Sequence, residues 1–324
     1  MSSAQSLTAI VAALTAALLA TPAFAQDNKV ATPVAIAISG WTGFAPLTLA
    51  KEAGLFQKQG LDVTIKKIPQ KDRHLAIASG DVQCAATTVE TWVVWNANGV
   101  ATTQIFQLDK SYGADGLVVK PGIAKITDLK GKTVAASAPG TAPYFGLAWI
   151  LKKNGLSMKD VKVLTLEPQP VANAIIAGTT DFDGGMTYEP YLSAVRAKPE
   201  AGKIIATTLD YPMVMDTFGC TPKFLKENPK AAKALADGYF AALDMIKAEP
   251  KKSYEIMGAD VKQSGEAFEK SAAFLRWQDR AANLKFFAGE HAQFTKEAAD
   301  LLLEIGTIKA IPDLKSLADT SFIK

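Results

Sequence analysis

The sequence predicts an α/β protein of two lobes, each built on a sheet with parallel strands. Short runs of β-branched residues alternate with helical patterns, which is typical of βαβ units. The same order of strands and helices returns later in the chain, and marker residues at the ends of the elements return with it. One architectural plan is therefore present twice, and two copies of a βαβαβ unit predict two lobes.

The first copy is expected between Val34 and Asn96, where apolar β-branched runs and amphipathic stretches alternate. Its elements are strand Val34–Ser39, helix Ala45–Ala53, strand Val63–Ile68, helix Asp72–Ser79, strand Val82–Ala86 and helix Val89–Asn96. The second copy repeats this order with strand Thr133–Ser137, helix Ala142–Asn154, strand Lys162–Leu166, helix Val171–Ala177, strand Phe182–Met186 and helix Glu189–Ala197.

Residues at the element ends correspond between the copies. Ser39 and Ser137 close the first strands, and Gly54 and Gly155 follow the first helices, where glycine suits a C-cap. In open α/β sheets a ligand binds at the edge formed by the carboxyl ends of the strands. Each lobe is therefore expected to offer such an edge to a shared cleft.

The C-terminal part is predicted to be helical. An apolar stripe at steps of three and four consists of Ala232, Leu235, Tyr239, Leu243 and Ile246, and a further helix is expected at Phe294–Leu303. Neither helix buries its face alone, so both are expected to pack on the first lobe. The segments Ser111–Lys120 and Thr207–Gly219 are the expected crossings between lobes.

A cleavable leader is expected at the N-terminus. Residues 1–25 hold no charged side chain and end in Ala23-Phe24-Ala25, which predicts cleavage before Gln26. No cysteine stands directly after that site, so a soluble periplasmic product rather than a lipoprotein is expected. The expected organisation is leader 1–25, first part of lobe 1 at 26–115, lobe 2 at 116–215 and the return to lobe 1 at 216–324.

Composition narrows the function classes. A net charge of +3 from 35 basic and 32 acidic residues argues against a nucleic-acid partner, which calls for a clustered basic face. Two cysteines, Cys84 and Cys220, are too few for a disulfide framework. They are expected to be small buried apolar residues, with a bridge as the alternative.

Four segments resemble the nitrate/sulfonate/taurine/bicarbonate group of ABC transporter periplasmic binding proteins, a group that is also similar to binders of thiamine-pyrimidine precursors. They are Gly43–Phe56, Ala78–Val82, Leu129–Ala135 and Tyr188–Tyr191. The resemblance implies a type II periplasmic binding fold with a ligand cleft between its lobes. It also implies a small-molecule solute delivered to an inner-membrane ABC permease and its ATPase, a monomer, and no cofactor or metal.

An anion site is expected where the second copy's first strand meets its helix. Ser137, Gly140, Thr141 and Ala142 lie in that turn, and free N–H groups of a helix N-terminus bind carboxylate, sulfonate or phosphate. The alternative is plain N-capping by Thr141. In the resembling family the matching turn contacts ligand, which favours the anion site.

The first lobe offers two further turns to the cleft. Their candidate ligand-binding residues are Trp41, Gly43, Phe44, Thr88 and Glu90. Trp41 is the expected aromatic wall, whereas Trp92 and Trp95 lie within a helix and are expected in the core. Glu90 either caps its helix as an acid in the first turn or receives a ligand donor.

Acids complete the expected site. Tyr188, Glu189 and Asp216 lie after the second lobe's third strand and in the return crossing. Carboxylates complement an ammonium or amidine and repel a bare anion. Together with the expected anion site they favour a zwitterionic or nitrogen-containing solute, such as a taurine-like sulfonate, over nitrate or bicarbonate.

Two other function classes remain as alternatives. Fungal thiamine-pyrimidine synthases share the implied fold but use a reactive histidine and a cysteine-rich iron motif. Here His74, beside Arg73 in a stretch expected to face solvent, and His291 are interpreted as surface residues, so no enzyme is expected. A ligand-presenting sensor is the other alternative.

Overall fold

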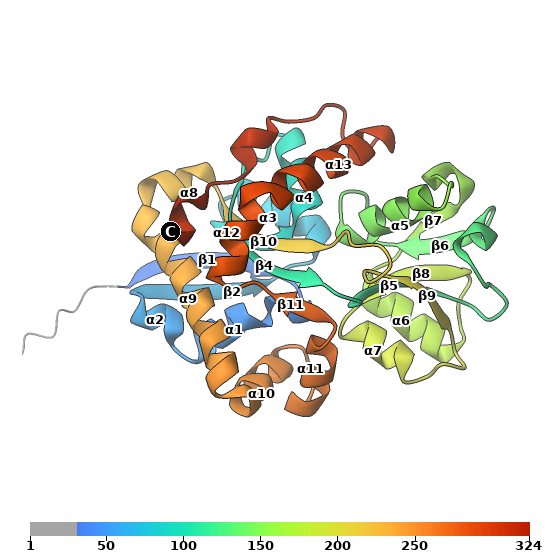
Figure 1. The fold of residues 1–324 in the computed structure, drawn as a ribbon, viewed down its shortest axis with the longest axis horizontal. Coiled ribbons are helices and arrows are strands. Elements are labelled where there is room, and N and C mark those ends of the chain that lie inside the picture. Colours follow the sequence, from blue (N-terminus) through green and yellow to red (C-terminus); the bar gives the residue numbers. More distant parts are fainter. Residues whose placement is uncertain (1–30) are drawn as a thin grey trace, which may run out of the picture. The chain divides into compact units, whose positions relative to one another are not determined.

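The computed structural model describes residues 31–324, and the expected leader at residues 1–25 lies outside this range. The described strands form two sheets (Figure 1). In order across the first sheet they are β11 (Leu275–Trp277), β4 (Thr103–Ser111), β10 (Met215–Cys220), β3 (Cys84–Thr88), β1 (Thr32–Ile38) and β2 (Leu61–Lys67). Across the second they are β7 (Lys162–Thr165), β6 (Thr133–Ala136), β8 (Gly184–Tyr188), β5 (Asp115–Val119) and β9 (Lys203–Thr207).

The two sheets share one topology, which confirms the predicted repetition. In the first sheet β1 pairs in parallel with β2 and β3, and β10 then pairs antiparallel with β3. In the second sheet β6 pairs in parallel with β7 and β8, and β5 then pairs antiparallel with β8. Each sheet therefore has a parallel part from its own βαβαβ unit, and antiparallel strands follow it: β10, β4 and β11 in the first sheet, and β5 and β9 in the second.

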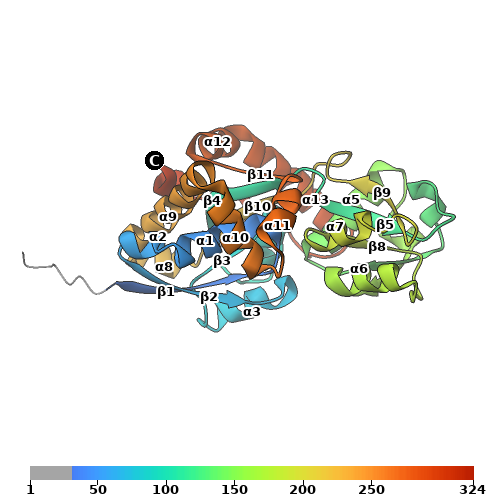
Figure 2. The ribbon, with the colours of Figure 1, turned by 90° about the horizontal axis from the view of Figure 1, so that it is seen from below.

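Helices cover both faces of each sheet (Figures 1 and 2). The helices that belong to the lobe of the first sheet are α1 (Ala45–Glu52), α2 (Leu55–Lys58), α3 (Arg73–Ala78), α4 (Val89–Ala97), α8 (Pro222–Glu227), α9 (Pro229–Ala248), α10 (Pro250–Asp260), α11 (Gly265–Ala272), α12 (Arg280–Lys285) and α13 (His291–Glu304). Those of the second lobe are α5 (Ala142–Lys153), α6 (Pro168–Ala177) and α7 (Tyr191–Arg196).

Alternation along the strands decides which helix covers which face. In β1, Ile36 and Ile38 join the core cluster that contains α1 and α9, whereas Ala37 between them packs with Ile77 of α3 and Trp92 of α4. Because successive side chains of a strand point to opposite faces, one short strand serves two helical layers. The fully apolar strands that the sequence shows are the consequence of this double burial.

The second sheet follows the same rule. Val134 and Ala136 of β6 pack with Phe145 of α5, whereas Ala135 packs with Val171 of α6.

The helices end as expected: Gly54 and Gly155 have φ of 68° and 72°, in the left-handed region that favours glycine at a C-cap.

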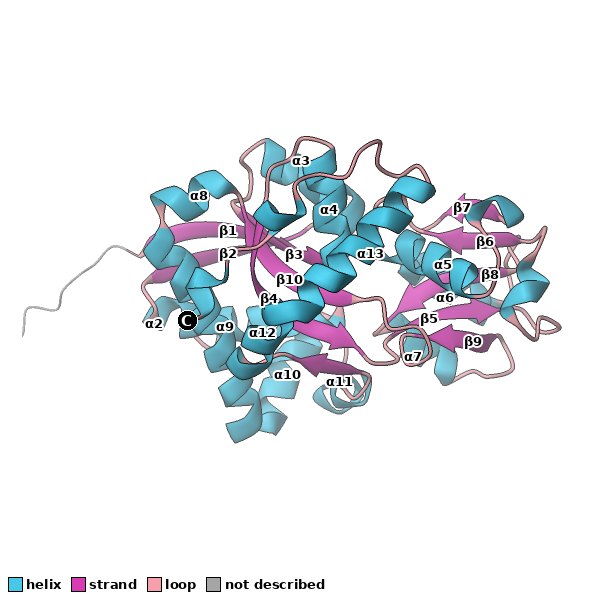
Figure 3. Cartoon of the chain, turned by 45° about the horizontal axis from the view of Figure 1, so that its top comes forward, coloured by secondary structure: helices cyan, strands magenta, loops and turns pink. Residues whose placement is uncertain are grey.

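The C-terminal helices pack mainly on the first lobe, as expected, with one exception. Helix α9 lies against α1 and α2. Helix α13 lies against α4 and also against α5 of the second lobe (Figure 3). The ring centroid of Phe294 on α13 lies 5.9 Å from that of Trp149 and 6.3 Å from that of Phe145, both on α5. The C-terminal part therefore contacts both lobes.

The chain passes between the sheets twice within the described residues. Residues 112–114 connect β4 to β5, and residues 208–214 connect β9 to β10. Both connections lie inside the segments expected to cross. Gly113 in the first connection has φ of 95°, a backbone conformation that a side chain strongly disfavours.

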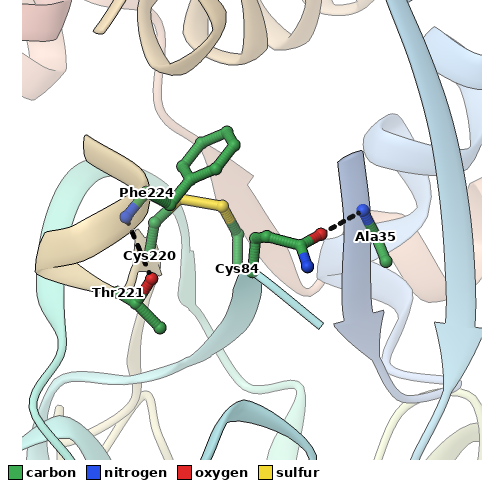
Figure 4. Close-up of a disulfide and its surroundings, with 6 residues drawn as sticks. Ala35, Cys84, Cys220, Thr221 and Phe224 are labelled. Atoms are coloured by element: carbon green, nitrogen blue, oxygen red, sulfur yellow. Dashed lines mark hydrogen bonds between the residues drawn. A yellow bond between two sulfur atoms is a disulfide. The ribbon is translucent and has the colours of Figure 1, made fainter. Parts of the chain in front are cut away.

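The two cysteines correct the expectation that they are separate buried residues. Cys84 and Cys220 are fully buried and joined by a disulfide between β3 and β10 (Figure 4). They are direct cross-strand partners in the antiparallel register, although 136 residues separate them in sequence. Their proximity depends on the return of the chain to the first sheet, which cysteine spacing does not reveal.

His291 also lies where it was not expected. The sequence placed it on the surface, but its side chain is buried on α13, and its Nε2 lies 3.2 Å from Oε1 of Gln104 on β4. Burial lowers the pKa of His291 to about 4, so the ring is neutral at pH 7. Trp92 and Trp95 lie in the core, as expected.

Among residues 31–324, no helix is both long and apolar enough to cross a membrane.

The disulfide is expected to be a main source of stability. A bridge that closes a loop of this length restricts the unfolded chain, so the double variant Cys84→Ser/Cys220→Ser should lose about 2–5 kcal/mol of unfolding free energy. Urea denaturation with and without dithiothreitol measures this. The reductant should lower the stability of the native protein and leave the double variant unchanged. Equal responses of both proteins would contradict the assignment.

Candidate functional site

A small cavity, lined mostly by buried residues, lies where the two sheets meet. It contains about 300 Å³ of space not filled by atoms, including the part open to solvent. Its walls are Ser39, Trp41, Phe44, Gln70, Arg73, Thr88, Asp115, Ala142, Tyr188, Val214 and Asp216. Larger hollows lie between α10 and α11 and beside α9, but exposed side chains such as Glu269 line them. Of these hollows within residues 31–324, the cavity between the sheets is the one with buried charged groups in its walls, so it is the candidate site.

Strand direction brings the two cavity acids together. The parallel strands β3 and β8 end at the cleft with Thr88 and Tyr188. Because β10 and β5 run antiparallel to them, these strands begin at the cleft, and Asp216 pairs with Thr88 while Asp115 pairs with Tyr188. The two aspartates thus occupy equivalent places in the two lobes.

Arg73 is the cationic group of the cavity. Its side chain is almost completely buried at 1 % exposure, at the start of α3. Its Nε donates to the Ile68 carbonyl at 2.9 Å and one Nη donates to the Ala86 carbonyl. No carboxylate in residues 31–324 lies within ion-pair distance of the guanidinium. Burial lowers the pKa of Arg73 to about 10, so it remains charged at pH 7.

Four buried carboxyl groups lie at or near the cavity. Burial raises the pKa of Asp115 to about 7 and that of Glu90 to about 8. The pKa values of Asp109 and Asp216, which are cross-strand partners, lie well above the usual range because of burial and then of repulsion by neighbouring carboxylates. These groups hold protons near neutral pH unless a positive charge stabilises their ionised forms.

One oxygen of Asp115 is of particular interest. Its Oδ2 is buried and accepts no hydrogen bond from any residue of the described range. A buried carboxylate oxygen without a donor is costly, typically by about 1–3 kcal/mol. In the wall of a cavity, such an oxygen is an acceptor available to a solute.

Six of the twelve residues expected from the sequence line the cavity. They are Trp41, Phe44, Thr88, Ala142, Tyr188 and Asp216. Trp41 packs edge-on against Tyr188, with ring centroids 5.5 Å apart, so the aromatic wall joins the two lobes. The indole Nε1 of Trp41 lies 3.3 and 3.4 Å from the two carboxylate oxygens of Asp109.

The other six lie outside the lining: Gly43, Glu90, Ser137, Gly140, Thr141 and Glu189. Glu189 forms an ion pair with Arg196 and accepts from the Ser193 amide at 3.1 Å, so its charge is already compensated. Ser137 donates to Glu167 at 2.6 Å. Their positions after strands are as expected, but their side chains bind other protein groups.

Gly43 and Glu90 do not line the cavity but contact residues that lie in or next to its wall. A Cβ on Gly43 would lie 2.2 Å from both Asp109 Oδ2 and Trp41 Nε1, so only glycine permits their contact. Glu90 accepts from Thr88, and its second oxygen Oε2 has no hydrogen-bond donor within residues 31–324. Glu90 does not cap its helix through its side chain in this geometry.

The turn before α5 contacts the other lobe. The Ala142 amide donates to Gln70 Oε1 at 3.2 Å, and the Gly140 carbonyl accepts from Thr91 at 3.1 Å. Thr141 bonds to the Ala138 carbonyl and gives no side-chain cap to α5. Gly140, with φ of 86°, would place a Cβ 2.9 Å from Val94 of α4. This turn therefore holds the lobes together.

Five lining residues were not expected: Ser39, Gln70, Arg73, Asp115 and Val214. The interpretation of the Arg73 stretch as solvent-facing was wrong, because Arg73 points inward from a short helix whose next residue is half-buried. The position of Asp115 in the repeated plan could have identified it from the sequence. It begins the strand that, in the second lobe, corresponds to the strand that Asp216 begins in the first.

The fold is that of a two-lobed type II periplasmic binding protein, a class that encloses small molecules between its lobes. Residues 41–253 match the family model described as NMT1/THI5 like, and the chain belongs to this family. It is 27% identical over 309 residues to the taurine-binding periplasmic protein of Escherichia coli (strain K12), covering 91% of this chain and 93% of that protein.

Solved structures agree on the fold. The alkanesulfonate-binding protein SsuA from Xanthomonas axonopodis pv. citri, bound to MOPS, has a TM-score of 0.75 at 16% identity, covering 90% of this chain and 99% of that one. The desulfurization enzyme DSZB has a TM-score of 0.66 at 14% identity, covering 90% and 97%. The fold thus occurs in binding proteins and in an enzyme.

Stability should depend on pH through the buried acids. The pKa of an aspartate is about 4 in an unfolded chain, whereas that of Asp115 is about 7 in the fold. Between these values the folded state holds a proton that the unfolded state has released, so unfolding free energy falls as pH rises through this window. Chemical denaturation at pH 5 and pH 8 should show the ligand-free protein more stable at pH 5.

The variant Asp115→Asn tests the contribution of this residue. An amide carries no charge to bury, so the variant should exceed the native protein in unfolding free energy at pH 8 by about 1–4 kcal/mol, with a smaller difference at pH 5. Asp62→Asn, at an exposed position on β2, is the control and should change neither value. A loss of stability at pH 8 in Asp115→Asn would contradict the prediction.

Proposed function

We propose that the protein captures a small zwitterion, with a cationic nitrogen at one end and an anionic group at the other, for an ABC-type importer. The observation that carries this proposal is the presence, in one cavity, of a buried cation without an ion pair and of buried carboxyl groups that a solute cation would ionise. Arg73 is buried without an ion pair in the described chain, and Asp115 has a buried oxygen without a donor. A zwitterion of matching length compensates both.

The anionic end belongs at Arg73. A guanidinium has five N–H donors, and backbone carbonyls of Ile68 and Ala86 engage two of its nitrogens. A planar guanidinium suits bidentate recognition of an oxyanion such as a sulfonate or carboxylate. Because the surrounding residues are buried, the interaction is stronger than at an exposed surface.

The cationic end belongs between Asp115 and Asp216. One aspartate comes from each lobe, so an ammonium that contacts both stabilises the closed cleft. A positive charge also lowers the raised pKa values of these acids, so binding releases protons. Nitrate or another bare anion gains nothing from these two groups, which favours a nitrogen-containing solute.

The relatives support this choice of solute class. The name of the E. coli relative states that it binds taurine, which is a sulfonate with an amine. We therefore assign an aminoalkanesulfonate as the first solute to test. Delivery to an inner-membrane permease and its ATPase, action as a monomer, and division into lobes at residues 26–115, 116–215 and 216–324 belong to the same proposal.

A binding role is favoured over catalysis by the position of the reactive residues. Neither His74 nor His291 lines the cavity, and both cysteines are bound in the disulfide. An enzyme like the thiamine-pyrimidine synthases needs such side chains at the solute. Among residues 31–324 there is also no group of three histidine, cysteine or acidic residues arranged to hold a metal ion.

Calorimetry on two variants tests the proposed solute. Asp216→Asn should weaken taurine binding by roughly 5- to 150-fold, from the loss of about 1–3 kcal/mol for a charge-assisted hydrogen bond, and should spare ethanesulfonate, which lacks the nitrogen. Arg73→Lys should weaken both solutes, because lysine cannot form the bidentate contact. Asp62→Asn is again the matched control.

The outcome that contradicts the zwitterion is specific. If Asp216→Asn weakens taurine and ethanesulfonate equally, the acid does not recognise the nitrogen. If the native protein binds ethanesulfonate or nitrate more tightly than taurine, the solute is a simple anion.

Export is the remaining part of the proposal. When the full chain is produced with its own N-terminus in a Gram-negative host, we expect periplasmic protein that begins at Gln26. N-terminal sequencing of the periplasmic fraction measures this. Recovery of cytoplasmic protein that begins at Met1 would contradict export.

A further inference from the structure

A second hollow lies next to the cavity, on its outer side. It contains about 990 Å³, including the part open to solvent. Both lobes contribute to it: Gly40 and Lys67 come from the first, and Pro190 and Tyr191 come from the second, while Lys262 lies in the turn after α10. We call this hollow the outer groove.

A thin wall separates the outer groove from the cavity. Along the turn after β1, Ser39 and Trp41 line the cavity, whereas Gly40 between them lines the outer groove. At the end of β8, Tyr188 lines the cavity, whereas Tyr191 at the start of α7 lines the outer groove. Two short segments, one from each lobe, therefore have one side toward each hollow.

Tyr191 fills the gap between these segments. Its hydroxyl lies 3.6 Å from the position that a Cβ on Gly40 would take, so the phenol reaches from α7 across to the first lobe. Its ring packs on Tyr188, with centroids 5.8 Å apart, and Tyr188 packs on Trp41. The three rings form a continuous row, and Trp41, at the inner end of this row, is only 5 % exposed.

The nitrogen of a bound zwitterion lies toward this row. Asp115 is the cross-strand partner of Tyr188, and side chains of such pairs lie on the same face of a sheet. A substituent on a nitrogen held by Asp115 therefore meets the Tyr188–Tyr191 wall before it reaches the outer groove.

We propose that Tyr191 determines solute size by closing the cavity against substituents on the cationic nitrogen, and that the outer groove accepts such substituents once the phenol is removed. The inference rests on the proposed function for the identity of the solute. It assigns to Tyr191 a selective role separate from the residues that hold the charges.

Binding of an N-alkyl series tests the selective role. The probes are taurine and its N-butyl and N-hexyl derivatives, measured by calorimetry on the native protein, Tyr191→Ala and Tyr191→Phe. The native protein and Tyr191→Phe should bind taurine at least about tenfold more tightly than either derivative. Tyr191→Ala should keep taurine binding and gain affinity for the derivatives, by up to about fourfold for each methylene that the groove buries.

A second measurement does not depend on the solute. Acrylamide quenching of Trp41 fluorescence, obtained as the difference from the Trp41→Phe background, should increase in Tyr191→Ala and stay at the native level in Tyr191→Phe. Unchanged quenching in Tyr191→Ala shows that Tyr191 is no wall and overturns the inference.

The two proposals fail in different ways. If the native protein binds neither taurine nor its derivatives, the zwitterion assignment fails, and quenching still decides whether Tyr191 closes the cavity. If the native protein binds taurine and Tyr191→Ala discriminates against N-hexyltaurine as strongly as before, the proposed function stands and the size filter is wrong. Retained taurine binding by Tyr191→Ala shows that the variant is folded.

Discussion

The site depends on one constraint of the backbone, the antiparallel entry of β10 and β5 beside parallel strands. A strand that runs against its neighbour begins where the neighbour ends. Asp216 and Asp115 are thereby brought to the edge where Thr88 and Tyr188 end the parallel strands. The same two strands follow the crossings between lobes, so the connection of the lobes and the position of their acids have a single origin.

This placement has a cost in stability, and the cost indicates function. Four carboxyl groups near the cavity are buried, and burial raises the pKa of each of them. If these carboxyl groups served only the fold, each would be expected to pair with a cation, as Glu189 pairs with Arg196. Within the described chain Arg73 is the only basic side chain in the cavity wall, and it pairs with none of the four. An unpaired buried cation and several buried acids with raised pKa values around one cavity favour binding over packing.

Much of the fold could be predicted from the sequence because its signals are local. Apolar β-branched runs, the glycines at 54 and 155 and the repeated order of elements each depend on near neighbours in the chain. The site could be predicted only in part. Position after a strand pointed to Trp41 and Asp216, which line the cavity, but it did not show that Glu189 faces Arg196 instead. The disulfide and the inward direction of Arg73 depend on long-range pairing, which a single sequence does not reveal.

The turn before α5 shows how the protein separates closure from recognition. Gln70 donates to the hydroxyls of Thr87 and Thr91 at 2.9 Å and accepts from the Ala142 amide at 3.2 Å. A neutral amide of one lobe thus takes one of the N–H groups that the sequence assigned to a solute anion. These contacts between the lobes involve neutral groups and no charge. In the proposed function, selection among solutes falls to Arg73, Asp115 and Asp216, whose burial makes each of them sensitive to the charge that it meets.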